Sequence, residues 1–525
     1  MLLHIIKRAV LSAGISCALS GCVNHAQQGH PDMSPLVQTE AGEISGKRLA
    51  EGGNAYLGIP YAAAPVGSRR WRAPEPAASW QGIRDATSYG ASCMQAVQPE
   101  GQPPMNEDCL FLNVWTPGNA GAKSRLPVVV YLHGAGFNTG SASQAAFSGE
   151  TLAQHDVILV NMNYRLGVMG GLALPALTAS SPDHSSGNYQ YLDQIAALRW
   201  VQRNIARFGG DPGNVMLMGQ SSGAINVSIL QASPLARGLF SKVLALSGAG
   251  VMHGGAWPGW TLSEAEQQGL RVQAATGAKS LEELRAMPAQ EVISHAKFYF
   301  PVGAEGHVLP QHPAEIFAGG KQNDVPTFIG NTRDEGFSSI AKAQSVAQFQ
   351  SDVRQMFGNQ ADRVLQLYPA SSDAEVASVA TRLANAGEFA KQMTQWARLQ
   401  SATGKSPSYL FVFDGAQGPA PHGRDVAYWF GRMDQVDARR FVAPTAEDRR
   451  LSEKMVALLV AYARTGIPRT DAIDVPAYRR TAESVIELGN PIVSRPLDAG
   501  VDYFLDHPEL IVGIGEPGLN PLKAK

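Results

Sequence analysis

The pentapeptide Gly219-Gln220-Ser221-Ser222-Gly223 is the most informative stretch of this 525-residue chain. It follows the apolar run 215–218, which is typical of a buried strand, and precedes the apolar stretch 224–230, which suits a helix. A Gly-x-Ser-x-Gly sequence between a strand and a helix is typical of a nucleophile elbow, where the glycines permit a sharp turn that exposes the serine hydroxyl. The pattern predicts a catalytic Ser221, with an ordinary glycine-serine turn as the alternative.

The composition indicates a large globular core without a nucleic-acid partner. Apolar residues make up 44% of the chain and charged residues 17%, below the roughly 25% charged residues of an average globular protein. The net charge is −2 and no basic run is present, so binding to nucleic acid is not expected. The sequence has no His-Glu-x-x-His motif and no Cys/His cluster, so neither a metal site nor another cofactor is expected.

Apolar strand candidates alternate with helical patterns after residue 35. The strand candidates are 110–115, 127–133, 157–163, 215–218, 243–246, 325–329 and 409–413, and the clearest helical patterns are 191–208, 263–275, 281–295 and 446–464. This alternation predicts the α/β class, with a mostly parallel central sheet covered by helices on both faces. Segment 252–323 lacks a clear strand and is expected to form helices and loops over the active site. With no linker apparent, 36–525 is predicted to be a single catalytic domain.

Residues 1–21 have the features of an export signal. Lys7 and Arg8 precede the apolar stretch 9–19, which is shorter than the about 20 residues needed to span a bilayer. The signal ends in a Leu-Ser-Gly-Cys sequence at 19–22, which resembles the lipobox of bacterial lipoproteins and implies lipidation of Cys22. Residues 22–35 then form a flexible tether, and Val23 resembles the residue found in lipoproteins sent to the outer membrane. A plain secretory signal, giving a soluble periplasmic or secreted protein, is the alternative.

The remaining cysteines agree with export. Cys17 leaves with the signal and Cys22 receives lipid, so Cys93 and Cys109 remain. In an oxidising compartment this pair is expected to form a disulfide, which would stabilise the fold by about 3 kcal/mol. Two buried thiols are the alternative.

A serine nucleophile needs a base to take its proton and an acid to orient the base. His422 is a good candidate for the base, because it lies in a loop directly after the strand candidate 409–413. Strand candidate 325–329 is followed by the adjacent carboxylates of Asp334 and Glu335, and their chemistry alone leaves the choice of acid open. A small-residue loop at 133–137 could supply backbone N–H groups to an oxyanion, together with the N–H of Ser222.

Four further motifs stand out along the chain: Gly58-Ile59-Pro60-Tyr61-Ala62, Glu107-Asp108-Cys109-Leu110-Phe111-Leu112-Asn113-Val114, Asn163-Tyr164-Arg165-Leu166-Gly167 and Phe208-Gly209-Gly210-Asp211-Pro212. From about residue 37 to the C-terminal region, the chain thereby resembles the type B carboxylesterase family, which includes cholinesterases and bacterial para-nitrobenzyl esterases. The resemblance implies the α/β-hydrolase fold.

Position by position, the resemblance also assigns roles to individual residues. It implies that Ser221 is the nucleophile, His422 the base and Glu335, rather than Asp334, the acid. The further residues implied are Ala135, Gly136 and Ser222 as oxyanion donors, Ser247 as a hydrogen-bond partner of the acid, and Cys93 as the partner of Cys109.

Three residues depart from the family pattern. Gln220 stands where a glutamate usually precedes the nucleophile, so no preference for quaternary ammonium esters is expected. Ala135 replaces the usual glycine, and a left-handed backbone there would cost about 1 kcal/mol. Ser222 replaces the usual alanine and is expected to matter little, because its contribution comes from the main chain.

The sequence thus predicts a serine hydrolase that cleaves small-molecule carboxylic esters through an acyl-enzyme. A peptidase or amidase on the same fold is one alternative. A non-catalytic binding protein is another, although such relatives typically lack a triad residue. Aromatic residues near loops that could line the pocket, or equally belong to the core, are Phe137, Trp257, Trp260, Phe298, Tyr299, Phe300 and Trp429.

Lipidation is tested by growing cells that express the protein with a radioactive fatty acid. The protein should carry label, and Cys22→Ser should abolish it, because the cysteine thiol is the acceptor. An unlabelled wild-type protein, or a labelled Cys22→Ser variant, would contradict the assignment.

Overall fold

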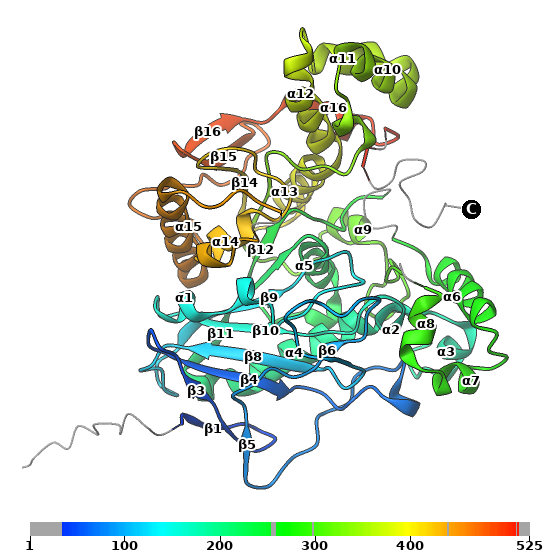
Figure 1. The fold of residues 1–525 in the computed structure, drawn as a ribbon, viewed down its shortest axis with the longest axis vertical. Coiled ribbons are helices and arrows are strands. Elements are labelled where there is room, and N and C mark those ends of the chain that lie inside the picture. Colours follow the sequence, from blue (N-terminus) through cyan, green and yellow to red (C-terminus); the bar gives the residue numbers. More distant parts are fainter. Residues whose placement is uncertain (1–33, 254–258, 297–298, 438–439, 511, 514–525) are drawn as a thin grey trace, which may run out of the picture. The chain divides into compact units, whose positions relative to one another are not determined.

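A mixed eleven-stranded sheet organises the described part of the chain (Figure 1). The computed structural model describes residues 34–253, 259–296, 299–437, 440–510 and 512–513. In spatial order the strands are β16 (Val493–Pro496), β15 (Ser484–Gly489), β14 (Ser408–Gly415), β13 (Thr327–Thr332), β12 (Lys242–Leu246), β11 (Gly210–Gln220), β9 (Leu126–Leu132), β10 (Ile158–Met162), β8 (Phe111–Thr116), β4 (Asn54–Pro60) and β3 (Lys47–Arg48). The strands from β15 to β10 run parallel, and both edges are antiparallel.

Helices cover both faces of this sheet. The α-helices are α1 (Glu150–Ala153), α2 (Gly167–Gly171), α3 (Pro175–Ser180), α4 (Tyr189–Asn204), α5 (Ser222–Ala232), α6 (Leu262–Thr276), α7 (Leu281–Ala286), α8 (Ala289–Ser294), α9 (Pro313–Ala318), α10 (Val346–Phe357), α11 (Ala361–Leu367), α12 (Asp373–Asn385), α13 (Lys391–Thr403), α14 (Asp425–Trp429), α15 (Ala446–Thr465) and α16 (Ala499–Asp506). Two small sheets stand apart, formed by β1 (Leu36–Gln38), β2 (Glu43–Ser45) and β5 (Ile83–Asp85), and by β6 (Ser92–Cys93) and β7 (Met105–Asn106).

Strand β9 shows why the sheet is covered on both sides. Its side chains alternate between faces, with Val128 and Val130 in one core cluster and Val129 and Tyr131 in another. The first cluster includes side chains of α4, α5 and α13, and the second includes those of α14 and α15. Parallel strands buried on both faces are nearly all apolar, which explains why these strands stood out in the sequence. The predicted α/β class with helices on both faces is confirmed.

The main departure from the predicted helices is at 281–295. One continuous pattern was expected there, but α7 ends at Ala286 and α8 begins at Ala289. Met287 is extended (ψ 145°) because the following Pro288 disfavours helical geometry in the residue before it and lacks an N–H. The described residues of segment 252–323 form α6 to α9 and no named strand, as expected.

The parallel register brings the loops that follow several strands to one edge of the sheet. Gly219 of β11 pairs with Leu132 of β9, Gln220 pairs with Leu246 of β12, and Leu246 pairs with Gly330 of β13. The loops after these strands therefore leave from the same carboxyl edge, where ligands bind in open α/β sheets.

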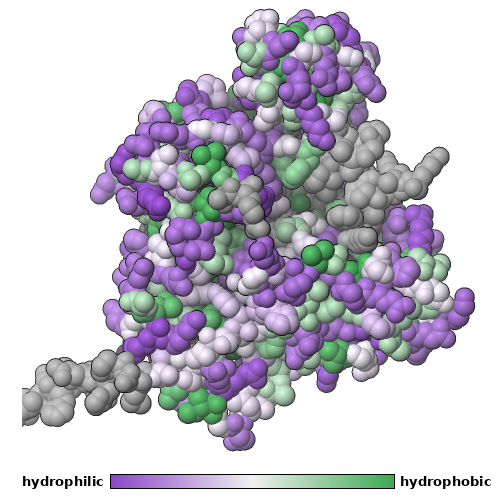
Figure 2. Space-filling model, in the orientation of Figure 1, coloured by the Kyte–Doolittle hydropathy of each residue, from purple (hydrophilic) through white to green (hydrophobic). Residues whose placement is uncertain are grey.

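Contacts within the chain group residues 35–525 as one compact unit. The predicted signal, the predicted lipidation site Cys22 and most of the predicted tether fall in 1–33, outside the described residues. Among the described residues, no helix combines the length and apolar character needed to cross a membrane. Figure 2 shows hydrophilic residues over most of the face in view, with smaller hydrophobic areas between them.

Cys93 and Cys109 form a disulfide, the pairing expected for the two remaining cysteines. The bond closes a loop with a sequence separation of 16, and Pro99, Glu100 and Gln102 of this loop line the pocket described below. The disulfide therefore fastens one wall of that pocket to β6 and to the segment just before β8.

Replacing both cysteines by serine (Cys93→Ser with Cys109→Ser) should lower the free energy of unfolding by about 3 kcal/mol, because the unfolded chain regains the entropy of the open loop. Denaturant titration measures this loss. Adding a reductant should destabilise the wild-type protein and leave the double variant unchanged. Equal stability of the two proteins under oxidising conditions would contradict the prediction.

Candidate active site

Ser221 occupies the turn between β11 and α5 with a strained backbone. Its φ of 57° and ψ of −126° are rare for a residue with a side chain, and such positions cost about 1–3 kcal/mol and occur preferentially at functional sites. The flanking glycines serve a different purpose from the one expected, since neither has a positive φ. A Cβ on Gly219 would collide with the Gly223 backbone, and one on Gly223 would lie 2.6 Å from the His133 oxygen. The glycines allow close approach, and the serine itself makes the turn.

The imidazole of His422 bridges the other two residues predicted for the triad. Its Nε2 lies 2.9 Å from Ser221 Oγ, and its Nδ1 lies 2.5 Å from Glu335 Oε2. Glu335 is 2% exposed, and its other oxygen accepts the Thr332 N–H at 2.9 Å. The structure thus brings together three residues that lie far apart in the sequence. Glu335, not the adjacent Asp334, faces the imidazole, as the family resemblance implied.

The loop 133–137, here called the oxyanion loop, lies against the elbow. A Cβ on Gly134 would be 2.9 Å from Ser221 Cβ, so only glycine fits there. Ala135 has φ 80° and Gly136 φ 68°. Ala135 therefore adopts the left-handed backbone considered above, with its cost of about 1 kcal/mol.

Hydrogen bonds from outside the oxyanion loop hold its backbone. The Tyr164 hydroxyl donates to the His133 carbonyl at 2.6 Å, and the Gly167 N–H donates to the Phe137 carbonyl at 2.8 Å. Burial lowers the pKa of His133 to about 4, so its ring, stacked on Tyr164, stays neutral near neutral pH.

Ser222 contributes more than its main chain, contrary to expectation. Its Oγ accepts the Phe137 N–H at 3.1 Å, which ties α5 to the oxyanion loop. An alanine, usual in the family, has no oxygen to make this bond. The hydroxyl therefore links the nucleophile's neighbour to the loop that carries Ala135 and Gly136.

The expected hydrogen bond between Ser247 and the acid is not formed. Ser247 is fully buried with φ 57°, and within the described structure its Oγ has no hydrogen-bond partner. The two oxygens of Glu335 are instead engaged by the Thr332 N–H and by His422.

Gln220 lies beside the imidazole. Its Nε2 is 3.2 Å from His422 Nε2, and the side chain is 8% exposed. A glutamate at this position would place a negative charge against the ring nitrogen that faces Ser221. The amide keeps this side of the site neutral.

The elbow opens into a cavity of about 520 Å³. Its walls come from segments that are distant in sequence and include Ser221, His422 and the first residues of the oxyanion loop. The further lining residues are Pro99, Glu100, Gln102, Gln144, Ala145, Ala146, Phe147, Gln220, Gly423, Arg424, Val426, Ala427, Gln435, Val436, Asp437, Arg440 and Phe441.

Two aromatic rings that sequence reasoning missed lie against His422. The centroid of Phe389 is 4.9 Å from that of the imidazole, and the centroid of Phe337 is 5.5 Å away. Phe389 belongs to a π-helical segment (Ala386–Ala390), a feature frequent at functional sites. Phe337 is 46% exposed. The sequence could have indicated that it lies near the site, because it follows the acid Glu335 by two residues.

The aromatic residues that the sequence offered as possible pocket residues differ in what they pack against. Phe137 contacts Phe300 with ring centroids 6.0 Å apart, whereas Trp429 packs against Phe328 and Phe411 in the core. Trp257 and Phe298 lie outside the described residues.

Comparison with known proteins agrees with the serine-hydrolase chemistry that the geometry of the site indicates. Residues 33–499 match the Carboxylesterase family. The fumonisin B1 esterase of Sphingopyxis macrogoltabida is 34% identical over 469 residues, which cover 84% of each chain.

The chain belongs to the carboxylesterase family. The para-nitrobenzyl esterase of Bacillus subtilis (strain 168) is 31% identical over 486 residues, covering 87% of this carboxylesterase and 95% of the relative. A solved PNB esterase structure aligns with a TM-score of 0.77 at 29% identity, over 90% of this chain and 99% of its own. The fold is that of the α/β-hydrolases, and the protein is a carboxylic ester hydrolase.

A buried acid lies close to the triad of this carboxylesterase. Asp425 begins α14, three residues after His422, and is fully buried. Burial, with a smaller contribution from the Glu335 charge, raises the pKa of Asp425 to about 7, against the opposing effect of His422. The folded protein therefore keeps this carboxyl protonated below about pH 7, whereas an exposed aspartate loses its proton at about pH 4.

Ser222→Ala should lower kcat about fivefold, because the oxyanion loop loses one hydrogen bond worth about 1 kcal/mol. KM should change little, and steady-state kinetics with para-nitrophenyl acetate measures both. Ser228→Ala is the matched control, since Ser228 lies on the same helix and is hydrogen-bonded to Ile225 and Gly250, away from the loop. Equal kcat values for the two variants would contradict a role for the Ser222 hydroxyl.

Asp425→Asn should become more stable, relative to the wild type, as the pH rises. The folded-state pKa of about 7 exceeds the unfolded value of about 3.9. The protonated carboxyl therefore favours folding at low pH, and this contribution is lost as the pH rises through about 7. Urea unfolding at about pH 5 and pH 8 measures the difference between the two proteins, and a difference that does not change with pH would contradict the assignment.

Proposed function

We propose that this carboxylesterase hydrolyses small-molecule esters through an acyl-enzyme on Ser221. The observation that carries the proposal is the continuous chain of contacts from Glu335 through His422 to Ser221, with His422 and Ser221 lining a cavity of about 520 Å³. A base within hydrogen-bond reach of a nucleophile, itself oriented by a buried acid, is the arrangement that activates a serine.

Each group then has a defined step. His422 Nε2 takes the Ser221 proton as Oγ attacks the ester carbonyl, and the same proton goes to the leaving alcohol when the tetrahedral intermediate collapses. Glu335 accepts a hydrogen bond from His422 Nδ1–H, and its negative charge stabilises the imidazolium. The N–H groups of Ala135, Gly136 and Ser222 donate to the oxyanion, each worth about 10²–10³ in rate. Water then attacks the acyl-enzyme while His422 takes its proton, and His422 returns that proton to Ser221 Oγ as the bond to the acyl group breaks and the acid leaves.

The neutral Gln220 supports esters that carry no positive charge near the elbow. A carboxylate there would attract a cation, whereas the amide beside His422 does not. The relatives are named for different esters, fumonisin B1 and para-nitrobenzyl esters among them. The choice of ester is therefore expected to depend on the walls of this chain's own cavity.

The protein's location is part of the proposal. Lipidation at Cys22 would anchor the enzyme to a membrane, since each buried methylene of the acyl chains contributes about 0.8 kcal/mol. The outer membrane is the proposed site, with the tether 22–35 letting the enzyme face the periplasm or the exterior. A soluble periplasmic or secreted enzyme is the alternative.

Ser221→Ala should reduce kcat on para-nitrophenyl acetate by up to about 10⁶, because the covalent route is lost. Steady-state kinetics on purified protein measures this, with matched amide and choline substrates assayed beside the ester. The ester should be hydrolysed faster than the amide, and the choline ester should gain nothing over a neutral ester of similar size. Substantial activity of Ser221→Ala would contradict the mechanism, and faster amide cleavage would favour an amidase.

A further inference from the structure

The loop that carries His422, here called the base loop (416–422), has no helix or strand of its own. It leaves β14 at Gly415 and ends shortly before α14. The imidazole must nevertheless reach Ser221 and Glu335 at the same time. Contacts outside the triad must therefore fix the backbone of this loop.

Asp334 makes two hydrogen bonds to one residue of the base loop. Its carboxylate accepts the Ala420 N–H at 2.8 Å, and its own N–H donates to the Ala420 carbonyl at 3.0 Å. Ala420 is fully buried, so its backbone groups have no water to replace these bonds. Asp334 immediately precedes Glu335, and Ala420 lies two residues before His422. The two bonds therefore couple the turn 332–335 that carries Glu335, here called the acid turn, to the base loop beside the reacting side chains.

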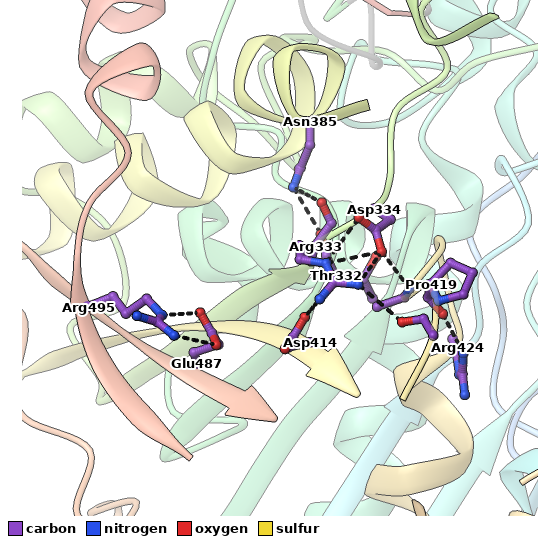
Figure 3. Close-up of polar contacts among 11 residues, drawn as sticks. Thr332, Arg333, Asp334, Asn385, Asp414, Pro419, Arg424, Glu487 and Arg495 are labelled. Atoms are coloured by element: carbon purple, nitrogen blue, oxygen red, sulfur yellow. Dashed lines mark hydrogen bonds and ion pairs between the residues drawn. The ribbon is translucent and has the colours of Figure 1, made fainter. Parts of the chain in front are cut away.

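Arg333 holds the Asp334 carboxylate in place and fastens the loop a second time (Figure 3). Its guanidinium donates to Asp334 at 2.7 Å and to the Gly418 carbonyl at 3.1 Å, and it pairs with Asp414 at the end of β14. On the other side of the loop, Arg424 donates to the Pro419 carbonyl. The base loop is thus held at several successive positions before His422.

The acid turn is itself anchored to a helix. The Asn385 side chain, at the end of α12, donates to the Thr332 carbonyl at 3.1 Å and to the Arg333 carbonyl at 2.8 Å (Figure 3). Thr332 and Arg333 are therefore held by contacts that do not involve the base loop. They provide a rigid frame against which Asp334 can position the loop.

We propose that Asp334, oriented by Arg333, is a positioning residue that sets the His422 imidazole between Glu335 and Ser221. This inference rests on the proposed function, in which His422 is the base. A displacement of about 1 Å at a catalytic group can cost about 10² in rate. The Arg333–Asp334 ion pair itself is partly exposed, with side chains 40% and 21% accessible, and such pairs add little to stability. The acceptor that Asp334 provides to Ala420 is therefore the contact that matters.

The test compares three variants with the wild type. Asp334→Ala removes the acceptor for the Ala420 N–H, and Asp334→Asn keeps an acceptor oxygen but loses the charge that Arg333 orients. Arg495→Ala is the matched control, because it breaks the exposed Arg495–Glu487 pair on β15 and β16, which does not contact the base loop (Figure 3). The readouts are kcat and KM for para-nitrophenyl acetate, the rate at which a fluorophosphonate labels Ser221, and the thermal midpoint.

Asp334→Ala should lower kcat about 100-fold, with KM within about twofold and the labelling rate falling in parallel. Asp334→Asn should restore much of the activity, leaving a loss of several-fold but below about tenfold. Arg495→Ala should keep wild-type kinetics. Wild-type kcat and labelling in both Asp334 variants would overturn the proposal.

Two controls separate this proposal from the proposed function. If Asp334→Ala does not fold, Asp334→Leu, which likewise offers no acceptor to the Ala420 N–H, takes its place, and wild-type kcat and labelling in that variant would overturn the positioning role. If wild-type Ser221 takes no fluorophosphonate, or Ser221→Ala hydrolyses the ester, the proposed function itself fails. An active wild type with a labelled Ser221 and unaffected Asp334 variants would leave the function standing and remove only the positioning role.

Discussion

The parallel register of the central strands is the constraint on which the site depends. It delivers the loops after β9, β11, β13 and β14 to one edge of the sheet, although their residues are scattered along the chain. The contact between Glu335 and His422 joins two of these loops, and the contact between His422 and Ser221 joins a third. The oxyanion loop, which follows β9, is the fourth of these loops, and its Gly134 packs closely against Ser221. No two of the triad residues are neighbours on one element, so the sheet itself supplies their alignment.

The site stores backbone strain that the surrounding structure must balance. Ser221, Ala135, Phe137 and Ser247 all have positive φ values without being glycine. Such conformations persist where neighbouring contacts over-determine them. Two hydrogen bonds are contacts of this kind. One runs from the Phe137 N–H to Ser222 Oγ, and the other runs from the Tyr164 hydroxyl to the His133 carbonyl. These bonds hold the backbone of the oxyanion loop, whose small residues do not restrict it by themselves.

The sequence was sufficient for the parts that have a local signature. The apolar runs before Ser221 and before the oxyanion loop predicted the strands β11 and β9, because strands buried on both faces are continuously apolar. The choice between Asp334 and Glu335 was not local, since adjacent carboxylates on one turn point in different directions and only the fold decides which faces His422. The same holds for Ser222, whose hydroxyl acquires its role from a loop 85 residues away. Phe389 had no signal at all, because a π-helical segment places it against the imidazole.

The most direct test of the account is to trap the acyl-enzyme. The purified protein is mixed with a slowly hydrolysed ester, quenched in acid within the first turnovers, and digested for mass spectrometry. The account predicts that the peptide containing Ser221 gains the mass of the acyl group, and that His422→Ala greatly slows its appearance. Ester hydrolysis without any acyl adduct, or with the adduct on another residue, would contradict the assignment of Ser221 as the nucleophile.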